Sequence, residues 1–143
     1  MKKCIACIIL LFAVLCIGAC RVQEEYSFSQ SVDNISYIAI ATAVFDEEGW
    51  FSHIEKTHIE DVEGFINSFR KIPCYIWFGD PIGIPPECDG ENLIKIVYTN
   101  GDYELIHWSG QAEYVEEHGF QMYAGFSVFD EEQFKAFATS YTV

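Results

Sequence analysis

Basic residues are scarce in this chain. Eight lysines and arginines stand against 22 aspartates and glutamates, which gives a net charge of −14. Nucleic-acid binding depends on lysine and arginine contacts to phosphates, and an acidic chain is repelled by anionic lipid headgroups. The composition therefore argues against a nucleic-acid partner. The simplest role of this acidic charge is to keep the protein soluble. The alternative role is to attract cations or a basic partner.

Motifs of the common enzyme classes are also missing. The sequence contains no Gly-x-Ser-x-Gly or Ser-x-x-Lys nucleophile motif, no His-Glu-x-x-His motif, no EF-hand loop and no glycine-rich phosphate loop. The four histidines show no metal-ligand spacing. We therefore expect no catalytic residues and no transition-metal site, and we expect His107 to be structural.

The apolar run at the N-terminus is too short to cross a bilayer comfortably. It extends from Ile5 to Ile17, after Met1-Lys2-Lys3, whereas a membrane-spanning helix needs about 20 residues. A basic start, a short apolar core and small residues before a cleavage site are typical of a secretory signal peptide.

The end of this run, Ile17-Gly18-Ala19-Cys20, resembles the lipobox of bacterial lipoproteins. The resemblance implies removal of residues 1–19 and a diacylglyceryl group on the Cys20 thiol, the only covalent cofactor expected. Anchoring by two acyl chains of the palmitate type is stable, whereas one chain is marginal. The implied location is the extracytoplasmic face of a bacterial cell membrane. An ordinary cleaved signal peptide or an uncleaved anchor helix is the alternative.

The rest of the chain predicts one domain behind a short polar segment. Residues 20–34 are expected to be the lipidated cysteine and a flexible polar tether, and residues 35–143 a single α+β domain. The expected order is ββα-β-loop-ββββ-α. It describes a mostly antiparallel sheet of about five to seven strands with two amphipathic helices packed on one face.

Hydrophobic periodicity and turn residues place these elements. A capping box, Thr57 to Glu60, predicts a helix over residues 58–71. Asp130 is expected to cap the last helix. The strands are expected at residues 35–45, 50–56, 74–78, 93–99, 102–108, 111–115 and 120–129.

The strongest turn signal is Asn100-Gly101 between two alternating runs. It favours a two-residue type I′ hairpin. That register pairs Ile96 with Leu105 and Ile94 with His107, and it places Glu104 on the opposite face.

Two cysteines, Cys74 and Cys88, flank a loop rich in glycine and proline. In an extracytoplasmic compartment they are expected to form a disulfide. This bond would close a loop of about 15 residues and contribute on the order of 3 kcal/mol. Two unpaired thiols are the alternative.

Three tryptophans and four acids are the remaining candidates for binding. Trp50, Trp77 and Trp108 lie at strand ends or turns, where aromatic side chains suit peptide or carbohydrate ligands, with core filling as the alternative. The weak candidate ligands for calcium are Asp80, Glu87, Asp89 and Glu91, with a solvated acidic loop as the alternative.

These observations favour a membrane-anchored, non-catalytic binding module for an envelope or extracellular protein or glycan. Two other functions remain open. One is a glycan-acting envelope enzyme that uses paired carboxylates, and the other is a purely structural envelope protein.

Overall fold

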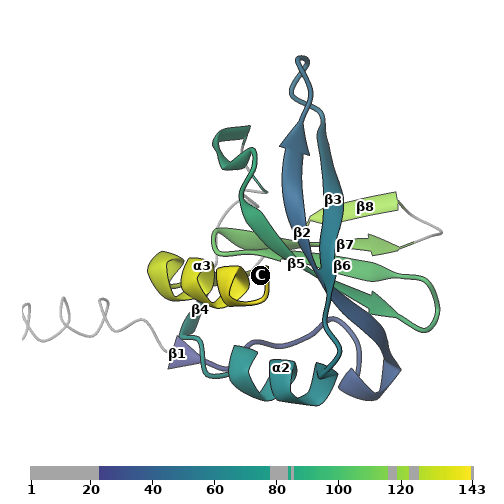
Figure 1. Cartoon of the computed structure of the whole chain (residues 1–143), viewed down its shortest axis with the longest axis vertical. Helices are drawn as coiled ribbons and strands as arrows, with labels where there is room; N and C mark the ends of the chain where they lie inside the picture. The colour runs from purple at the N-terminus through teal and green to yellow at the C-terminus, as the bar shows by residue number, and fades with distance from the viewer. Residues whose placement is uncertain (1–22, 78–83, 85, 116–118, 123–125, 143) are drawn as a thin grey trace, which may run out of the picture.

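The computed structural model describes residues 23–77, 84, 86–115, 119–122 and 126–142. Within these ranges the chain forms nine strands and two α-helices, with every strand pair antiparallel. Figure 1 shows the arrangement. The predicted α+β class is confirmed. The strands are divided between two sheets instead of one.

The larger sheet has the strand order β3-β2-β5-β6-β7-β8. Its strands alternate in direction along a simple path of hairpins, with one longer connection from β3 to β5 through α2 and β4. The bounds are β2 (Ile35–Phe45), β3 (Phe51–His58), β5 (Asn92–Tyr98), β6 (Tyr103–His107), β7 (Gly110–Val115) and β8 (Gly119–Met122).

The smaller sheet has the order β1-β4-β9 and includes residues expected to be a tether. Its strands are β1 (Gln23–Glu24), β4 (Cys74–Trp77) and β9 (Phe126–Phe129). Residues 23–34, here called the N-terminal segment, begin with β1, which pairs with β4, and end in a short 3-10 helix, η1 (Val32–Asn34). Tyr26 of this segment is buried in the core. The prediction of a flexible tether is therefore wrong for residues 23–34, because a buried aromatic anchors them.

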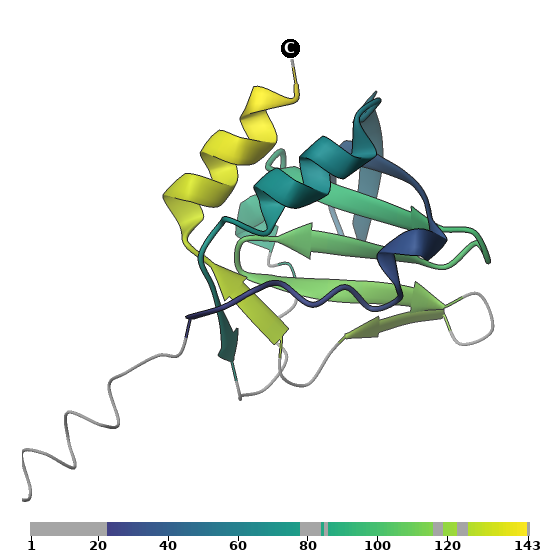
Figure 2. The ribbon, with the colours of Figure 1, turned by 90° about the horizontal axis from the view of Figure 1, so that it is seen from below.

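Two helices, α2 (Val62–Phe69) and α3 (Glu131–Ser140), lie along the same side of the larger sheet, as Figure 2 shows. They contact one another through Phe65 and Phe137, whose ring centroids are 5.0 Å apart. Asp130 caps α3 by accepting a hydrogen bond from the Gln133 N–H at 2.9 Å. This arrangement confirms the two amphipathic helices packed on one face.

The first helix starts later than the capping box predicts. Thr57 and His58 remain in β3, because they continue its pairing with β2. Asp61 is the actual N-cap, and its carboxylate accepts a hydrogen bond from the Gly64 N–H at 2.9 Å. The strand ladder thus outweighs the local helix signal.

The main core lies between the larger sheet, both helices and the smaller sheet. Isoleucines of β2, β5 and β6 form its floor, and Phe65 and Phe69 of α2 cover them with Phe129 of β9 and Phe134 of α3. A second, smaller cluster lies elsewhere around Ala41, Ala43 and Leu93.

The hairpin between β5 and β6 differs from its predicted register by one residue. Its loop has three residues, because the Tyr98 N–H donates to the Asp102 carbonyl at 2.9 Å and the Gly101 N–H to the Tyr98 carbonyl at 3.0 Å. Gly101 has φ +93°. A turn followed by a left-handed glycine is the usual three-residue hairpin loop.

A one-residue shift exchanges the two faces of a strand. Glu104 now pairs with Ile96 and lies on the core face, whereas His107 lies on the opposite face, two residues beyond Leu105. The predicted pairs Ile96–Leu105 and Ile94–His107 are therefore wrong. The shift places a carboxylate inside the core and brings the histidine to the opposite face, where its Nε2 lies 2.7 Å from Glu91.

Candidate functional site

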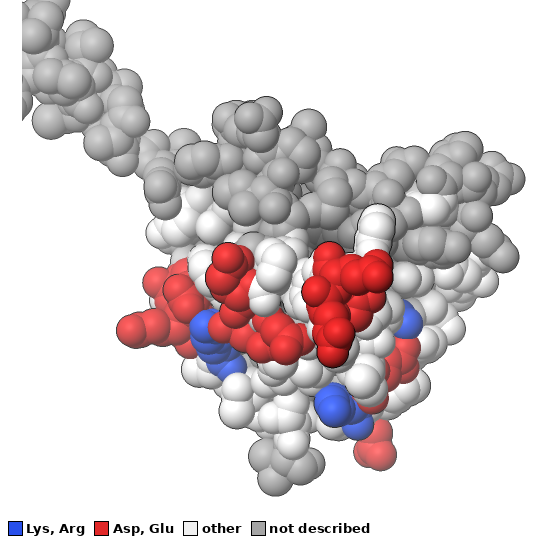
Figure 3. All heavy atoms as spheres, turned by 90° about the horizontal axis from the view of Figure 1, so that it is seen from above, with Lys and Arg blue, Asp and Glu red and all other residues white. Residues whose placement is uncertain are grey.

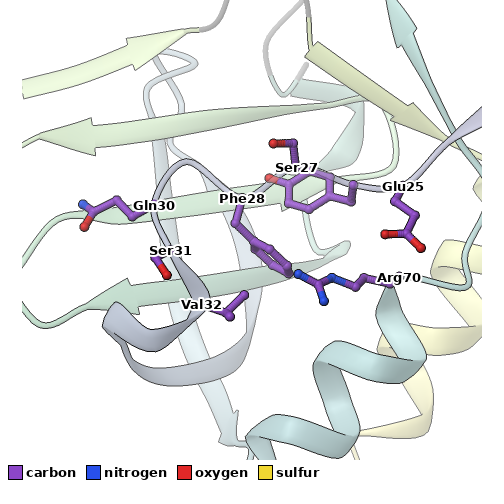
Figure 4. Close-up of a pocket in the computed structure, with 8 residues that line it drawn as sticks. Glu25, Ser27, Phe28, Gln30, Ser31, Val32 and Arg70 are labelled. Atoms are coloured by element: carbon purple, nitrogen blue, oxygen red, sulfur yellow. The ribbon is translucent and has the colours of Figure 1, made fainter.

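The N-terminal segment and the end of α2 form an open groove of about 450 Å³. Figure 4 shows the labelled side chains that line it. Apolar and hydroxyl or amide groups alternate along one wall, and one basic side chain enters from α2. The lining residues are Glu25, Tyr26, Ser27, Phe28, Gln30, Ser31, Val32 and Arg70.

Among the described residues that line this groove, Arg70 is the only one with a positive charge. Its guanidinium carbon lies 5.6 Å from the centre of the Phe28 ring, and Figure 4 shows the side chain extending toward that ring. Within the described ranges it makes no ion pair, and its Nε is buried without a hydrogen-bond partner. A buried donor in this state costs about 1–3 kcal/mol, so a ligand oxygen that reached it would be favoured.

Tyr26 fixes the floor of the groove through the buried carboxylate of Glu104. The Tyr26 hydroxyl donates to Glu104 at 2.8 Å, and the Tyr98 hydroxyl donates to the other oxygen of the same carboxylate. Burial and the neighbouring carboxylate raise the pKa of Tyr98, so this hydroxyl keeps its proton. The carboxylate thereby ties the N-terminal segment to β5 and β6.

A second polar centre surrounds His107 at the end of β6. The ring is fully buried, and its Nε2 lies 2.7 Å from Glu91 while its Nδ1 lies 2.7 Å from the Ser109 hydroxyl. Because a carboxylate only accepts hydrogen bonds, Nε2 carries the proton and Nδ1 accepts from Ser109. Cys88, in the 3-10 helix η2 (Pro86–Cys88), places its Sγ 4.0 Å from Nδ1.

Glu91 is held in its ionised form. Burial opposes ionisation, but hydrogen bonds from Lys135, Trp108 and His107 outweigh it and lower the pKa of Glu91 to about 2. The Lys135 Nζ lies 2.6 Å from one oxygen, and the Trp108 Nε1 lies 3.1 Å from the other. A small pocket of about 190 Å³ opens beside this carboxylate and is lined by Gly90, Glu91, Asn92, Lys135 and Thr139.

The other two groups of this centre are neutral. Burial lowers the pKa of His107, and the nearby Glu91 only partly opposes that effect. Burial, together with the charge of Glu91, raises the pKa of Cys88 to about 11. Cys88 is therefore a thiol and His107 a neutral imidazole at physiological pH, so the pair is not an activated thiolate nucleophile.

Ser109, His107 and Glu91 have the connectivity of a hydroxyl–imidazole–carboxylate relay. Ser109 is only 8% exposed and His107 is not exposed at all. A substrate carbonyl would reach the Ser109 hydroxyl only if the turn between β6 and β7 moved. The three residues therefore form an internal hydrogen-bond network.

The disulfide predicted from the cysteine spacing is absent. Cys74 and Cys88 are both buried and are not bonded to each other. Cys74 lies in β4 of the smaller sheet, where its Sγ is 2.9 Å from the Glu24 carbonyl. Cys88 instead packs beside His107. The two strands that frame the loop belong to different sheets, which separates the thiols.

The three candidate tryptophans do not form a common surface. Trp50 is 71% exposed at the tip of the β2–β3 hairpin, whereas Trp108 is half-buried and donates to Glu91. The side chain of Trp77 lies outside the described part of the chain. Trp50 and Trp108 therefore have different environments, and only Trp50 presents its ring to solvent.

The weak calcium candidates are not assembled either. Glu91 faces His107 and Lys135, and Asp89 accepts a hydrogen bond from the Phe45 N–H at 2.9 Å. Asp80 lies outside the described residues. Among those described, Glu91 is the only one of the four in a group that is close enough to hold an ion, and its partners there are Cys88 and His107.

Acidic side chains nevertheless gather on one end of the molecule. Figure 3 views this end, toward which the β2–β3 hairpin points, and shows several acidic side chains with few basic ones between them. Asp46, Glu47 and Glu48 are exposed at the hairpin, and Glu87 and Asp89 are exposed beside it. This surface would repel anionic partners.

No protein-family model, curated protein or solved structure matches this chain. Among the described residues, no helix combines the length and the apolar composition that a membrane span requires. The predicted signal peptide and Cys20 lie outside the described residues. The groove and the polar centre therefore have to be interpreted from their own chemistry.

Sequence reasoning missed both sites for identifiable reasons. Arg70 lies in the last turn of the helix predicted over residues 58–71, where a basic side chain ordinarily complements the helix dipole. Nothing in the sequence indicates that residues 25–32 fold against it. Cys88 and Glu91 are three residues apart, and His107 follows sixteen residues later. That spacing matches no metal or catalytic motif, and the pairing of β5 with β6 is what brings the three together.

Proposed function

We propose that this protein is a lipid-anchored, extracytoplasmic, non-catalytic binding module. Its groove, formed by the N-terminal segment and Arg70, would bind a carboxylate-bearing ligand of the cell envelope. The observation that carries this proposal is the Arg70 guanidinium, which lines the groove and has a buried Nε without a partner among the described residues. Arginine pairs with carboxylates in a planar, two-point geometry.

The polar lining adds specificity to this charge. Hydroxyl groups of Ser27 and Ser31 and the amide of Gln30 line the same groove, and the Phe28 ring offers an apolar surface next to the guanidinium. Ligand sites of binding proteins commonly combine an apolar wall with a few placed polar groups. A ligand with a carboxylate beside an aromatic or other apolar group would fit this lining.

Lipidation at Cys20 would hold the groove near the membrane. Only Arg21 and Val22 separate Cys20 from β1 in the sequence. At about 3.5 Å per residue, three extended steps span roughly 10 Å. The groove starts immediately after β1, at Glu25. An anchored domain of this kind would therefore collect its ligand close to the bilayer surface.

The pKa values of Glu55 and Glu91 agree with a non-catalytic role. A glycosidase of the paired-carboxylate type needs one carboxyl group with a raised pKa. Glu91 has a pKa lowered to about 2, and the pKa of Glu55 is also lowered, because hydrogen bonds from Lys95 and other partners outweigh its burial. Both shifts are opposite to the shift that a general acid requires.

The groove can be tested with a matched pair of small probes. N-acetyl-phenylalanine and its C-terminal amide differ only in the carboxylate. We expect the acid, but not the amide, to shift the NMR signals of the Arg70 side chain and of the Ser27 and Gln30 amides. Arg70→Gln should weaken binding about tenfold or more, since hydrogen bonds to charged groups contribute about 1.5–3 kcal/mol.

Lys71→Gln is the matched control, because Lys71 is the neighbouring exposed cation and does not line the groove. It should leave the affinity unchanged. Equal binding of acid and amide, or equal losses in the Arg70 and Lys71 variants, would show that the groove does not select carboxylates.

A further inference from the structure

We propose that Cys88, Glu91 and His107 form a binding site for a divalent transition metal ion of the zinc class. One ligand atom from each residue lies within 4.8 Å of the other two. Cys88 and His107 are buried, and the Glu91 side chain is 28% exposed. This site is separate from the Arg70 groove, so its test does not depend on the proposed function.

The donor set selects the class of metal. A thiol sulfur, an imidazole nitrogen and a carboxylate oxygen suit zinc and related ions, whereas calcium and magnesium prefer oxygen ligands alone. Three protein ligands with a fourth position left for water or ligand is the arrangement of zinc sites that remain open. The pocket beside Glu91, lined also by Asn92 and Lys135, offers a path to that fourth position.

The distances are close to those of a tetrahedral site. With Zn–N and Zn–O near 2.0 Å, a tetrahedral angle separates nitrogen and oxygen by about 3.3 Å. The His107 Nε2 and the nearest Glu91 oxygen are 2.7 Å apart. A small shift of the Glu91 side chain would open this distance for the ion, and a rotation of the Cys88 side chain would bring in its Sγ, which lies 4.0 Å from Nδ1 of the same ring.

The backbone around the three ligands is already fixed. The Glu91 N–H donates to the Cys88 carbonyl at 3.0 Å, and Gly90 and Glu91 exchange hydrogen bonds with Ala43 of β2 at 2.9 Å. His107 forms the last pair of β6 with β7, opposite Gly110. Two of the three ligands are therefore attached to the larger sheet through backbone pairing, and the third through a turn.

Outer contacts orient the ligands as in known metal sites. Lys135 and Trp108 hold the Glu91 carboxylate. The His107 Nε2–H points at the same carboxylate, at 2.7 Å. The ion would replace this proton between Nε2 and the carboxylate, and Nδ1 would then carry the ring proton and donate it to the Ser109 hydroxyl, which lies 2.7 Å away.

Binding would release one proton. The Cys88 thiol loses its proton when sulfur coordinates the ion, and the proton that leaves Nε2 of His107 is taken up at Nδ1. The two negative ligands then balance the charge of the divalent ion. A buried site without net charge avoids the large cost of an isolated buried ion.

The test is cobalt and zinc titration of the full chain, purified in detergent from its host and stripped with a chelator. Wild-type protein should bind one Co²⁺ with the near-ultraviolet thiolate-to-cobalt band, and Zn²⁺ should displace it while Ca²⁺ does not. Calorimetry in two buffers with different ionisation enthalpies should show one proton released per ion. Absence of the band in wild-type protein would overturn the proposal without any variant.

Variants assign the ligands. Cys88→Ser should abolish the band, and His107→Gln and Glu91→Gln should each weaken zinc binding at least about tenfold. Cys74→Ser is the matched control, because Cys74 is also a buried cysteine but lies outside the cluster. A band lost in Cys74→Ser and retained in Cys88→Ser would contradict the assignment, as would zinc affinity unchanged in the His107 variant.

Discussion

At the scale of single residues, Glu104 and Arg70 are two charged side chains that the fold treats in opposite ways. Glu104 is completely buried and is compensated by two tyrosine hydroxyls. Arg70 has a buried Nε for which the described part of the chain supplies no acceptor. Proteins satisfy nearly all buried polar groups. The buried group without an acceptor is the Nε of Arg70, which borders the groove. We therefore assign ligand binding to Arg70 and a structural role to Glu104.

The start of α2 permits a prediction about a single glycine. A Cβ at Gly64 would lie 2.1 Å from one oxygen of the Asp61 carboxylate, whose other oxygen caps the helix. Replacing glycine by alanine in a helix normally stabilises it by about 1 kcal/mol, while loss of an N-cap costs about 1 kcal/mol. We therefore expect Gly64→Ala to give no gain in the wild-type protein, because it displaces the cap.

The double variant isolates this coupling. In an Asp61→Ala background the cap is already absent, so Gly64→Ala should raise the free energy of unfolding by about 1 kcal/mol. Urea denaturation of the four proteins measures the coupling. The same gain from Gly64→Ala in both backgrounds would show that Asp61 and Gly64 do not interfere.

The sequence predicted the roles of single residues less well than it predicted the helices and strands. Asp130 was identified as a cap because its local pattern, an aspartate before an amphipathic run, is sufficient. Asp61 was missed because Thr57 also fits a capping pattern, and only the pairing of β3 with β2 excludes it. The burial of Glu104 depends on one glycine, Gly101, whose conformation sets the hairpin loop and thereby the face of every residue in β6.

At the scale of elements, the N-terminal segment is the main departure from expectation. Its composition is polar, which predicts a tether, yet Tyr26 packs against Phe69 and Phe129 with ring centroids 5.2 and 5.5 Å away. Tyr26, together with the partly buried Phe28 and Val32 that pack against the same core, opposes the entropy of ordering the polar neighbours. Strands and helices with strong periodicity, in contrast, were predictable, and α3 agrees with its prediction because its apolar stripe and cap coincide.

Removal of the Tyr26 hydroxyl should loosen the N-terminal segment. Tyr26→Phe deletes the hydrogen bond to Glu104 and leaves a buried carboxylate with one fewer donor, so we expect a loss of about 1–3 kcal/mol in the free energy of unfolding. Hydrogen exchange should increase in residues 23–34 before it increases in β5. Tyr37→Phe is the control, since the Tyr37 hydroxyl bonds to Glu55 at a partly exposed position, and it should cost much less. Equal losses in the free energy of unfolding for Tyr26→Phe and Tyr37→Phe would contradict the role assigned to Glu104.

At the scale of the whole molecule, the acidic surface and the two sites are distributed unevenly. Acidic side chains cover the end of the hairpin between β2 and β3 (Figure 3), whereas the groove lies beside β1 and the end of α2. An anchor at Cys20 would place β1 and the groove near the bilayer. Long-range charge repulsion would then keep the acidic end away from an anionic surface.

The central claim is that this groove works next to a membrane, and intact mass with membrane fractionation tests it most directly. The protein is expressed in its own host together with a Cys20→Ala variant. We predict a wild-type protein in the membrane fraction that lacks residues 1–19 and carries a diacylglyceryl adduct, and a Cys20→Ala protein that has lost the adduct. A full-length, unmodified wild-type protein in the soluble fraction would contradict the anchor and the membrane-proximal position of the groove.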